Sequence, residues 1–208
     1  MKTKFEKPKM SELTSRAFTN FRADQKDDTA TITGTPIVFD TPTDIGGLFE
    51  ETIARGAISD EVLKDVAFFY NHDLGSKPIA RTRTGKLKLA VDEKGVNMSA
   101  EVNLKRGDVS DLYEAIKDGD IDGMSFMFRV EGEEWRDLDS EYPKRQITKV
   151  GYVQEVSAVN YPAYESTGIQ ARTNREVDTN RQALDNARAE VVDTARILAL
   201  EKLKTKYL

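Results

Sequence analysis

Alternation of apolar and polar residues dominates the middle of the chain. β-Branched residues recur through residues 29–40, TATITGTPIVFD. In residues 87–102, every second position is apolar on both sides of a Glu-Lys-Gly turn. A period of two is typical of a strand with one buried face, and two such runs around a turn predict a β-hairpin. Further strands are predicted at residues 123–132, 145–153 and 153–161.

A short helix is predicted in residues 106–120, RGDVSDLYEAIKDGD. Asp108 is its candidate N-cap and Gly119 its stop. Its apolar face is made of Val109, Leu112 and Ile116.

The chain changes character from residue 172 onward. After a polar hinge at residues 172–180, the segment 181–204 contains no Gly or Pro. Its apolar residues recur at helical spacing: Leu184, Ala187, Val191, Ala195 and Leu198. This pattern predicts a long amphipathic helix. Two roles stay open for it, a helix that docks on a partner or one that covers the protein's own apolar surface or an oligomer interface.

Many short strands with few helices predict an α+β fold, mainly β. We expect a small closed or partly closed β-barrel with a few flanking helices and the long C-terminal helix. With 208 residues and 38% hydrophobic content, the chain can bury one core rather than two. The predicted parts are a mobile N-terminal arm (1–27), a β-barrel domain (28–171) and a hinge with a helical tail (172–208).

Composition excludes several classes of protein. The net charge of -5 argues against a nucleic-acid binder. The absence of cysteine excludes disulfides, thiolate nucleophiles and zinc-thiolate sites. No run approaches the ~20 apolar residues of a membrane span, and the N-terminus lacks the apolar core of a secretory signal. We therefore expect a soluble, intracellular protein that binds neither membrane nor nucleic acid.

The candidate chemistry starts from His72, the one histidine of the chain. A hydrolase without cysteine needs a Ser or Thr nucleophile and a nearby base, and His72 is the only imidazole available. An isolated histidine at a strand end is more often structural, so His72 alone does not establish an enzyme. One histidine with scattered carboxylates does not match metal-site spacings, and we expect no metal and no cofactor.

Ser125 stands out among the ten serines. It follows Gly119 and Gly123 and opens a strongly apolar strand, in which Met124 and Phe126 share one face and Ser125 points to the other. A hydroxyl on a rigid strand end can serve as a nucleophile. The alternative is a serine that merely ends a Gly-rich turn.

Glu155 is the third candidate. In a strand it shares a face with Val153, Ser157 and Val159, and a carboxylate in such a row is costly unless it is paired. The N–H of a histidine is one suitable partner. The alternatives are a solvated Glu155 on the outer face, or a pair with a Lys or Arg such as Arg81.

The order of these segments resembles that of the tailed-bacteriophage prohead (capsid maturation) protease family, whose fold is similar to that of herpesvirus assemblin proteases. The resemblance covers roughly residues 28–170. The segments that carry it are Glu51 with Gly56-Ala57, the Asn71-His72-Asp73 segment followed by Pro78–Arg81, the Ser125-x-x-Phe128 strand start, and EVSAVNYPA at 155–163.

The resemblance implies roles for three residues. His72 corresponds to the general base, Ser125 to the nucleophile and Glu155 to the third member. Assemblin proteases pair their serine with two histidines, so a chain with one histidine requires an acidic third member or none. Ala80 stands where the family usually has Gly, and Phe126-Met127 replaces a smaller pair, which affects the expected shape of the pocket.

The resemblance also implies a biological role. We expect a serine endopeptidase that acts through an acyl-enzyme and cleaves scaffold and capsid-protein segments, and itself, inside the immature phage prohead in the host cytoplasm. Its implied partners are the major capsid protein and its scaffold segment, with self-association into a dimer or larger assembly left open. The alternatives are a non-catalytic capsid-assembly or scaffolding module and, below it, a barrel that binds a small ligand.

Overall fold

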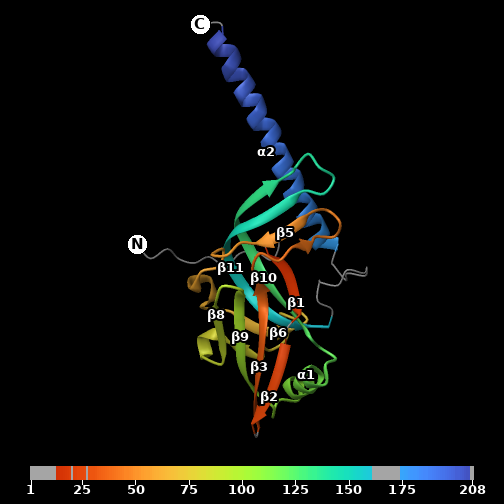
Figure 1. Ribbon diagram of the computed structural model, residues 1–208. Helices are drawn as coiled ribbons and strands as arrows, with labels where there is room; N and C mark the ends of the chain where they lie inside the picture. Colours follow the sequence, from red (N-terminus) through yellow and green to blue (C-terminus); the bar gives the residue numbers. More distant parts are fainter. Residues whose placement is uncertain (1–12, 20, 27, 161–173, 207–208) are drawn as a thin grey trace.

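The computed structural model describes residues 13–19, 21–26, 28–160 and 174–206 (Figure 1). The strands are β1 (Thr14–Thr19), β2 (Phe21–Lys26), β3 (Thr29–Val38), β4 (Thr43–Asp44), β5 (Glu50–Ile53), β6 (Ala67–Tyr70), β7 (Ala80–Arg81), β8 (Leu87–Val91), β9 (Gly95–Asn103), β10 (Gly123–Arg136) and β11 (Lys144–Val159). The helices are α1 (Gly107–Asp118), α2 (Asn174–Lys206) and two short 3-10 turns, η2 (Asp60–Leu63) and η3 (Thr82–Thr84).

The described strands form two sheets. One has the order β1-β10-β11-β5-β4, with β6 pairing with β11 and β7, and the other has the order β2-β3-β9-β8. The predicted α+β class, mainly β, is confirmed. The closed barrel is not confirmed: β1 and β2 follow each other in the chain but join different sheets, so the described strands are divided between the two sheets.

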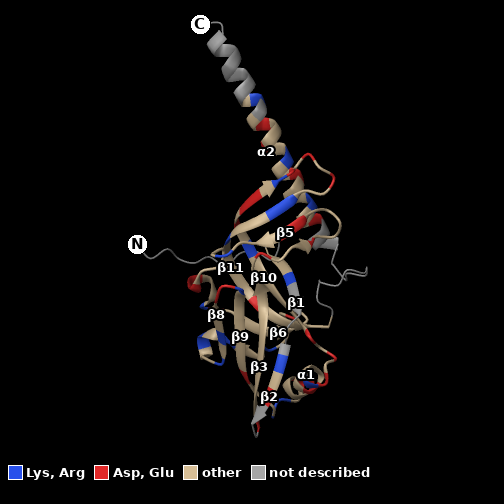
Figure 2. Ribbon diagram, in the orientation of Figure 1, with Lys and Arg blue, Asp and Glu red and all other residues tan. Residues whose placement is uncertain are grey.

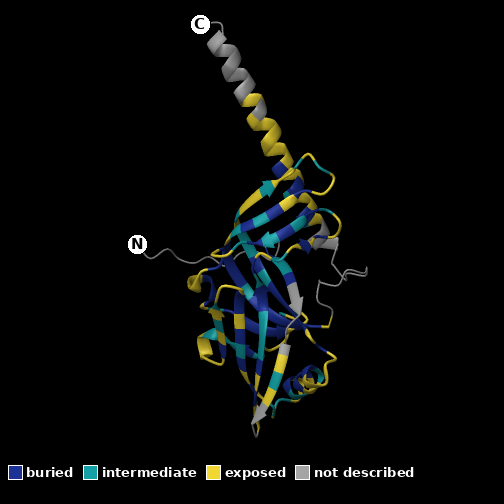
Figure 3. Cartoon of the chain, in the orientation of Figure 1, coloured by how far each residue is buried: buried dark blue, intermediate teal, exposed yellow. Residues whose placement is uncertain are grey.

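Residues from both sheets and from α1 pack into one main core. Ile32 and Met98 come from the smaller sheet, Phe126 and Val156 from the larger, and Ile116 from α1. Figure 3 shows this buried interior as dark blue along β3, β9, β10 and β11. Burying these side chains together contributes most of the stability expected for a fold of this size.

The strand β11 is longer than predicted and is irregular. The two expected strands 145–153 and 153–161 are one element, and β10 pairs with it in antiparallel fashion. Met127 faces Glu155 while the next residue, Phe128, faces Val153, so Gln154 is an extra residue in β11. Such a bulge changes which face the following side chains occupy. Val153 therefore joins the core with Phe128, and its expected place on the face of Glu155 was wrong.

The predicted hairpin and short helix are both present. Strands β8 and β9 pair in antiparallel fashion. Helix α1 buries its predicted apolar face and ends at Gly119, which has a φ of 84° in the left-handed region. The predicted N-cap was wrong. Arg106 takes that position, and the Asp108 carboxylate pairs with the Arg106 guanidinium at 2.6 Å instead of capping the helix.

The segment assigned to an N-terminal arm contributes two strands. Strand β1 pairs with β10, and β2 pairs with β3. The polar side chains of this segment hid that pairing, because the backbone groups that form a ladder are common to all residues except proline. Residues 1–12 of the expected arm lie outside the described residues.

Helix α2 begins against the sheets and then leaves them (Figure 1). Leu184 and Ala187 are buried, and Leu184 packs on Ile45 and Phe49 in a second, smaller apolar cluster. Further along, Val191 and Val192 are exposed, and Figure 3 shows this part of the helix in yellow. The expected hinge, 172–180, is helical from Asn174, and residues 161–173 lie outside the described part. The side chains of Ala195 and Leu198 lie outside it as well.

Basic and acidic residues are interspersed along the described chain (Figure 2). Within the described ranges, no helix has the length and apolar character needed to cross a membrane. The same part of the chain holds no group of three or more His, Cys, Asp or Glu side chains arranged to bind a metal ion.

Candidate active site

His72 follows β6, at a point where the backbone is held in an uncommon conformation. Asn71 and His72 have φ values of 49° and 57°, in the left-handed region that side chains other than glycine seldom adopt. The turn is fixed by hydrogen bonds from the Asn71 amide to the Ala158 carbonyl, 2.8 Å, and from the Asp73 amide to the Tyr70 carbonyl, 3.0 Å. Strained backbone of this kind concentrates at functional sites.

Strand β6 lies parallel to β11, which brings His72 beside Glu155. The Nδ1 atom of His72 is 2.7 Å from Oε1 of Glu155, whose side chain is fully buried, while the imidazole is 25% exposed. The other carboxylate oxygen accepts a hydrogen bond from the Ser157 hydroxyl. The same hydroxyl accepts the His72 backbone N–H at 3.2 Å. Both Glu155 oxygens are thus engaged, and the imidazole is held in one orientation.

The alternatives considered for Glu155 do not apply. The residue is not solvated, since its relative exposure is 0%. Arg81 pairs with Asp65 at 2.9 Å rather than with Glu155. A buried carboxylate that contacts an imidazole and a hydroxyl is compensated for its lost hydration.

Ser125 lies on β10, directly opposite Ser157 of β11. Its residue exposure is 1%, and its hydroxyl donates to the Arg16 carbonyl at 2.7 Å. Met124 and Phe126 on either side belong to the main core, which fixes the backbone at Ser125. The predicted serine is therefore on a rigid strand, within the same site as His72 and Glu155.

A hydroxyl that the sequence reasoning missed connects Ser125 to the histidine. The Oγ atom of Ser15, on β1, is 3.0 Å from His72 Nε2 and 2.9 Å from Ser125 Oγ. The four residues form a line from carboxylate to imidazole to two hydroxyls. The local sequence around Ser15 does not identify it as a site residue. Ser15 lies 110 positions from Ser125 in the sequence, and only the pairing of β1 with β10 brings the two together.

This arrangement is suited to activating a serine. A carboxylate on Nδ1 holds the imidazole so that Nε2 faces the hydroxyls and can accept a proton. A hydroxyl deprotonated in this way can attack a carbonyl carbon.

Comparison with known proteins identifies the family of the chain. A family model described as caudovirus prohead serine protease matches residues 18–182, a range that includes His72, Ser125 and Glu155. The chain belongs to the caudovirus prohead serine protease family. The "Prohead protease" of Enterobacteria phage HK97 is 27% identical over 135 residues, which cover 64% of this chain and 56% of that relative. No solved structure matches the chain significantly.

In this prohead protease family member, Ser15 and Arg16 precede the matched range. The Arg16 side chain nevertheless lies in the interior, where its Nε is 2.5 Å from Oε1 of Glu51 and its Nη2 is 2.9 Å from Oε2. Arg145 approaches the same Oε2 atom with Nη1 at 3.0 Å. Burial raises the pKa of Glu51, but the charges and hydrogen bonds of Arg16 and Arg145 outweigh it and hold that pKa below its ordinary value.

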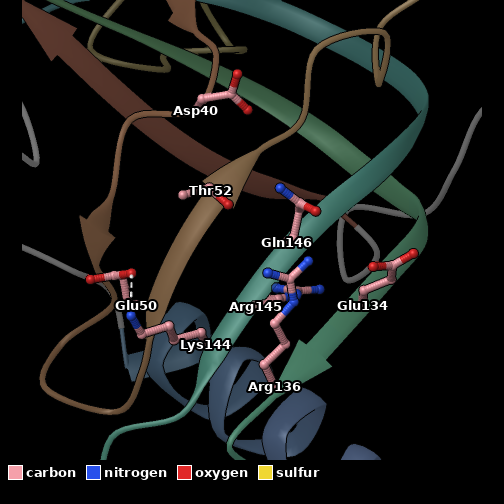
Figure 4. Close-up of a pocket in the computed structure, with 8 residues that line it drawn as sticks. All are labelled: Asp40, Glu50, Thr52, Glu134, Arg136, Lys144, Arg145 and Gln146. Carbon is pink, nitrogen blue, oxygen red and sulfur yellow. Dashed lines mark ion pairs between the residues drawn. The ribbon is translucent and has the colours of Figure 1, made fainter.

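A separate pocket of about 290 Å³ lies at the end of the larger sheet, along β5, β10 and β11 (Figure 4). Neither His72 nor Ser125 lines it. Its lining includes three acidic and three basic residues, which are Asp40, Glu50, Glu134, Arg136, Lys144 and Arg145. Because these charges balance, the pocket has no evident preference for an anion or a cation.

Proposed function

We propose that the chain is a serine endopeptidase that acts through an acyl-enzyme during maturation of a phage prohead. The observation that supports this most strongly is the buried contact between Glu155 and His72 Nδ1, which leaves Nε2 facing serine hydroxyls. Membership of the prohead serine protease family supports the same reaction.

Three residues carry the chemistry in this proposal. Ser125 is the nucleophile, because it lies on the rigid strand β10 in the family's Ser-x-x-Phe context. His72 takes the hydroxyl proton and then donates it to the leaving amine. Glu155 orients the imidazole and stabilises its protonated form.

The proposed substrates are segments of the major capsid protein and its scaffold, together with the chain itself. The proposed place of action is inside the immature prohead in the host cytoplasm. The far part of α2 is proposed to recruit the enzyme, since its described side chains Val191, Val192 and Ile197 are exposed apolar groups beyond the part that packs on the sheets.

The decisive experiment compares two serines that share one site. Intact-mass spectrometry over time is applied to the wild type, Ser125→Ala and Ser15→Ala, each alone and with a candidate scaffold or capsid polypeptide. Cleavage is expected from the wild type and from Ser15→Ala but not from Ser125→Ala. The exposed Ser59, changed to alanine, is a matched control that should cleave like the wild type.

Two results would contradict the proposal. Loss of cleavage in Ser15→Ala with retention in Ser125→Ala would move the nucleophile to Ser15. Cleavage that is the same in all variants, or absent from all of them, would favour the non-catalytic capsid-assembly or scaffolding module.

A further inference from the structure

The nucleophile of the proposed protease is covered by the chain's own strand β1. Ser125 is 1% exposed, and β1 pairs in antiparallel fashion with the strand that carries it, with Ala17 opposite Ser125. Peptide substrates of proteases often add a strand to an exposed sheet edge in this way, so that backbone hydrogen bonds set their register. Strand β1 therefore occupies the edge of β10 where a substrate would lie.

A peptide bond of β1 lies beside the Ser125 hydroxyl, as the cleaved bond of a substrate must. The Ser125 hydroxyl contacts the carbonyl oxygen of Arg16 at 2.7 Å, which puts the nucleophile next to the bond between Arg16 and Ala17. The atom to be attacked is the carbonyl carbon bonded to that oxygen, and attack requires the Ser125 oxygen within about 3–3.5 Å of it. Ser15, the residue before Arg16, lies against His72 with its Oγ atom 3.0 Å from Nε2.

The Arg16 side chain lies in a preformed binding site, called here the receptor, which consists of Glu51, Asn180 and the Phe128 ring. Its guanidinium group forms two hydrogen bonds with the buried Glu51 and one with the Ser15 carbonyl, at 2.6 Å, and Asn180 Oδ1 of α2 lies 3.5 Å away. Glu51 is 2% exposed, and the Arg16 guanidinium lies 6.0 Å from the centre of the Phe128 ring. A planar cation held by a carboxylate and an aromatic ring in a closed site is a selective arrangement.

The charge balance shows that this receptor suits an incoming cation. With Arg16 present, the cluster contains two guanidinium groups and the two carboxylates of Glu51 and Glu133. Glu133 is part-exposed, with 30% of its side chain accessible, so Glu51 is the buried carboxylate of the two. Without Arg16, Oε1 of Glu51 loses the Nε donor of that guanidinium, while Arg145 contacts only Oε2. A buried carboxylate oxygen without a donor is costly, so the empty receptor favours a cationic side chain that donates hydrogen bonds.

We propose that Glu51 selects a basic residue, arginine above all, on the N-terminal side of the bond that this protease cleaves, and that β1 is its built-in substrate, cut between Arg16 and Ala17. This inference rests on the proposed function. Ser125 Oγ forms an ester with the Arg16 carbonyl carbon as the peptide bond breaks. The Ser125 proton passes to His72 Nε2 and then to the leaving Ala17 nitrogen, and water hydrolyses the ester to the Arg16 carboxylate. Release of the N-terminal product, which carries β1 as far as Arg16, then empties the Glu51 receptor for other chains.

The test follows self-cleavage of the full chain. Wild type, Arg16→Lys, Arg16→Gln and Ser125→Ala are incubated, and products are identified by intact mass and N-terminal sequencing. A fragment that begins at Ala17 is expected from the wild type and Arg16→Lys, at least tenfold more slowly from Arg16→Gln, and not from Ser125→Ala. Arg22→Gln, an exposed arginine on β2, is the matched control and should behave like the wild type.

A second measurement separates recognition from folding, in case Arg16→Gln does not fold. Synthetic peptides with the sequence of residues 11–22, carrying Arg or Gln at position 16, are given to the wild type and to Glu51→Gln. The wild type should prefer the Arg peptide at least tenfold in kcat/KM, and Glu51→Gln should bring that ratio towards one. A purely structural Glu51 would lower activity on both peptides without changing their ratio.

The outcomes distinguish this inference from the proposed function. Ser125-dependent cleavage that ignores the charge at position 16, or that never occurs between Arg16 and Ala17, overturns the inference and leaves the protease intact. The pairing of Arg16 with Glu51 is then only a structural ion pair. Absence of any Ser125-dependent cleavage, in the chain or the peptides, overturns both.

Discussion

Glu155 Oε1 lies 2.7 Å from His72 Nδ1, although 83 positions separate the two residues in the sequence. The parallel pairing of β6 with β11 creates this contact, because it places the chain after Tyr70 beside the buried end of β11. The carboxylate is completely buried and contacts a hydroxyl with its second oxygen. The imidazole is therefore oriented by a group that solvent does not reach.

Glu155→Gln is expected to lower kcat by about 100- to 10,000-fold, because an amide can hold the ring in the wrong tautomer and cannot stabilise the imidazolium. KM should change little. The measurement is steady-state hydrolysis of a peptide that the wild type cleaves. Glu131→Gln, on the exposed side of the same sheet and paired with Lys149, is the matched control and should keep the wild-type kcat. A wild-type kcat in Glu155→Gln would contradict the orienting role.

Glu51→Gln is expected to lower the free energy of unfolding by about 3 kcal/mol, because it leaves the buried guanidinium of Arg16 without its charged partner. The exposed pair of Asp40 and Arg55, with side chains 46% and 66% exposed, provides the comparison. Asp40→Asn should cost less than about 1 kcal/mol. Urea unfolding measures both, and equal losses in the two variants would show that the burial of Glu51 does not matter.

Acid should weaken the wild type more than Glu51→Gln. The folded-state pKa of Glu51 is lowered, so its contribution to stability is complete above the ordinary glutamate pKa of about 4.3 and is lost as the pH falls through the lower folded value. The difference in unfolding free energy between wild type and variant should therefore shrink below about pH 4.3. Denaturant midpoints between pH 7 and pH 3 test this.

Other carboxylates also titrate in that range, but they do so in both proteins. Hydrogen bonds from the Lys94 amide lower the pKa of Asp92, and the Arg106 side chain lowers that of Asp108. Their effects cancel in the difference between wild type and Glu51→Gln. A difference that stays constant from pH 7 to pH 3 would contradict the assignment.

Removal of residues 190–208 is expected to leave the domain folded with nearly the same melting temperature, because the described apolar side chains beyond Ala189 are exposed. Leu184→Ala should instead cost about 2–3 kcal/mol, since Leu184 is 5% exposed and fills the cluster with Ile45 and Phe49. Val192→Ala is its exposed control. Thermal unfolding measures stability, and co-sedimentation with a capsid or scaffold polypeptide tests recruitment. Unchanged co-sedimentation of the shortened chain would contradict docking through α2.

Much of the fold and of the site followed from local patterns. The period of two in β8 and β9 shows which side chains face the core, because alternate residues of a strand face opposite sides of a sheet. Helix α1 and its end at Gly119 followed from spacing and from the left-handed cap. His72, Ser125 and Glu155 were singled out by residue type and order, and the structure brings them into one site; their catalytic roles stay predictions.

The sequence by itself determined the mainly β class, the faces of most strands and the residues able to carry hydrolytic chemistry. These features depend on the order of polar and apolar side chains within short segments. Only the tertiary structure decided that β1 lies against β10, that Ser15 stands between Ser125 and His72, and that Arg16 reaches Glu51. The alternation of apolar residues also did not predict the bulge at Gln154, which places Val153 in the core. The physical reason is that strand pairing depends on backbone hydrogen bonds that nearly every residue can form, so partners far apart in sequence are chosen by the packing of the whole chain.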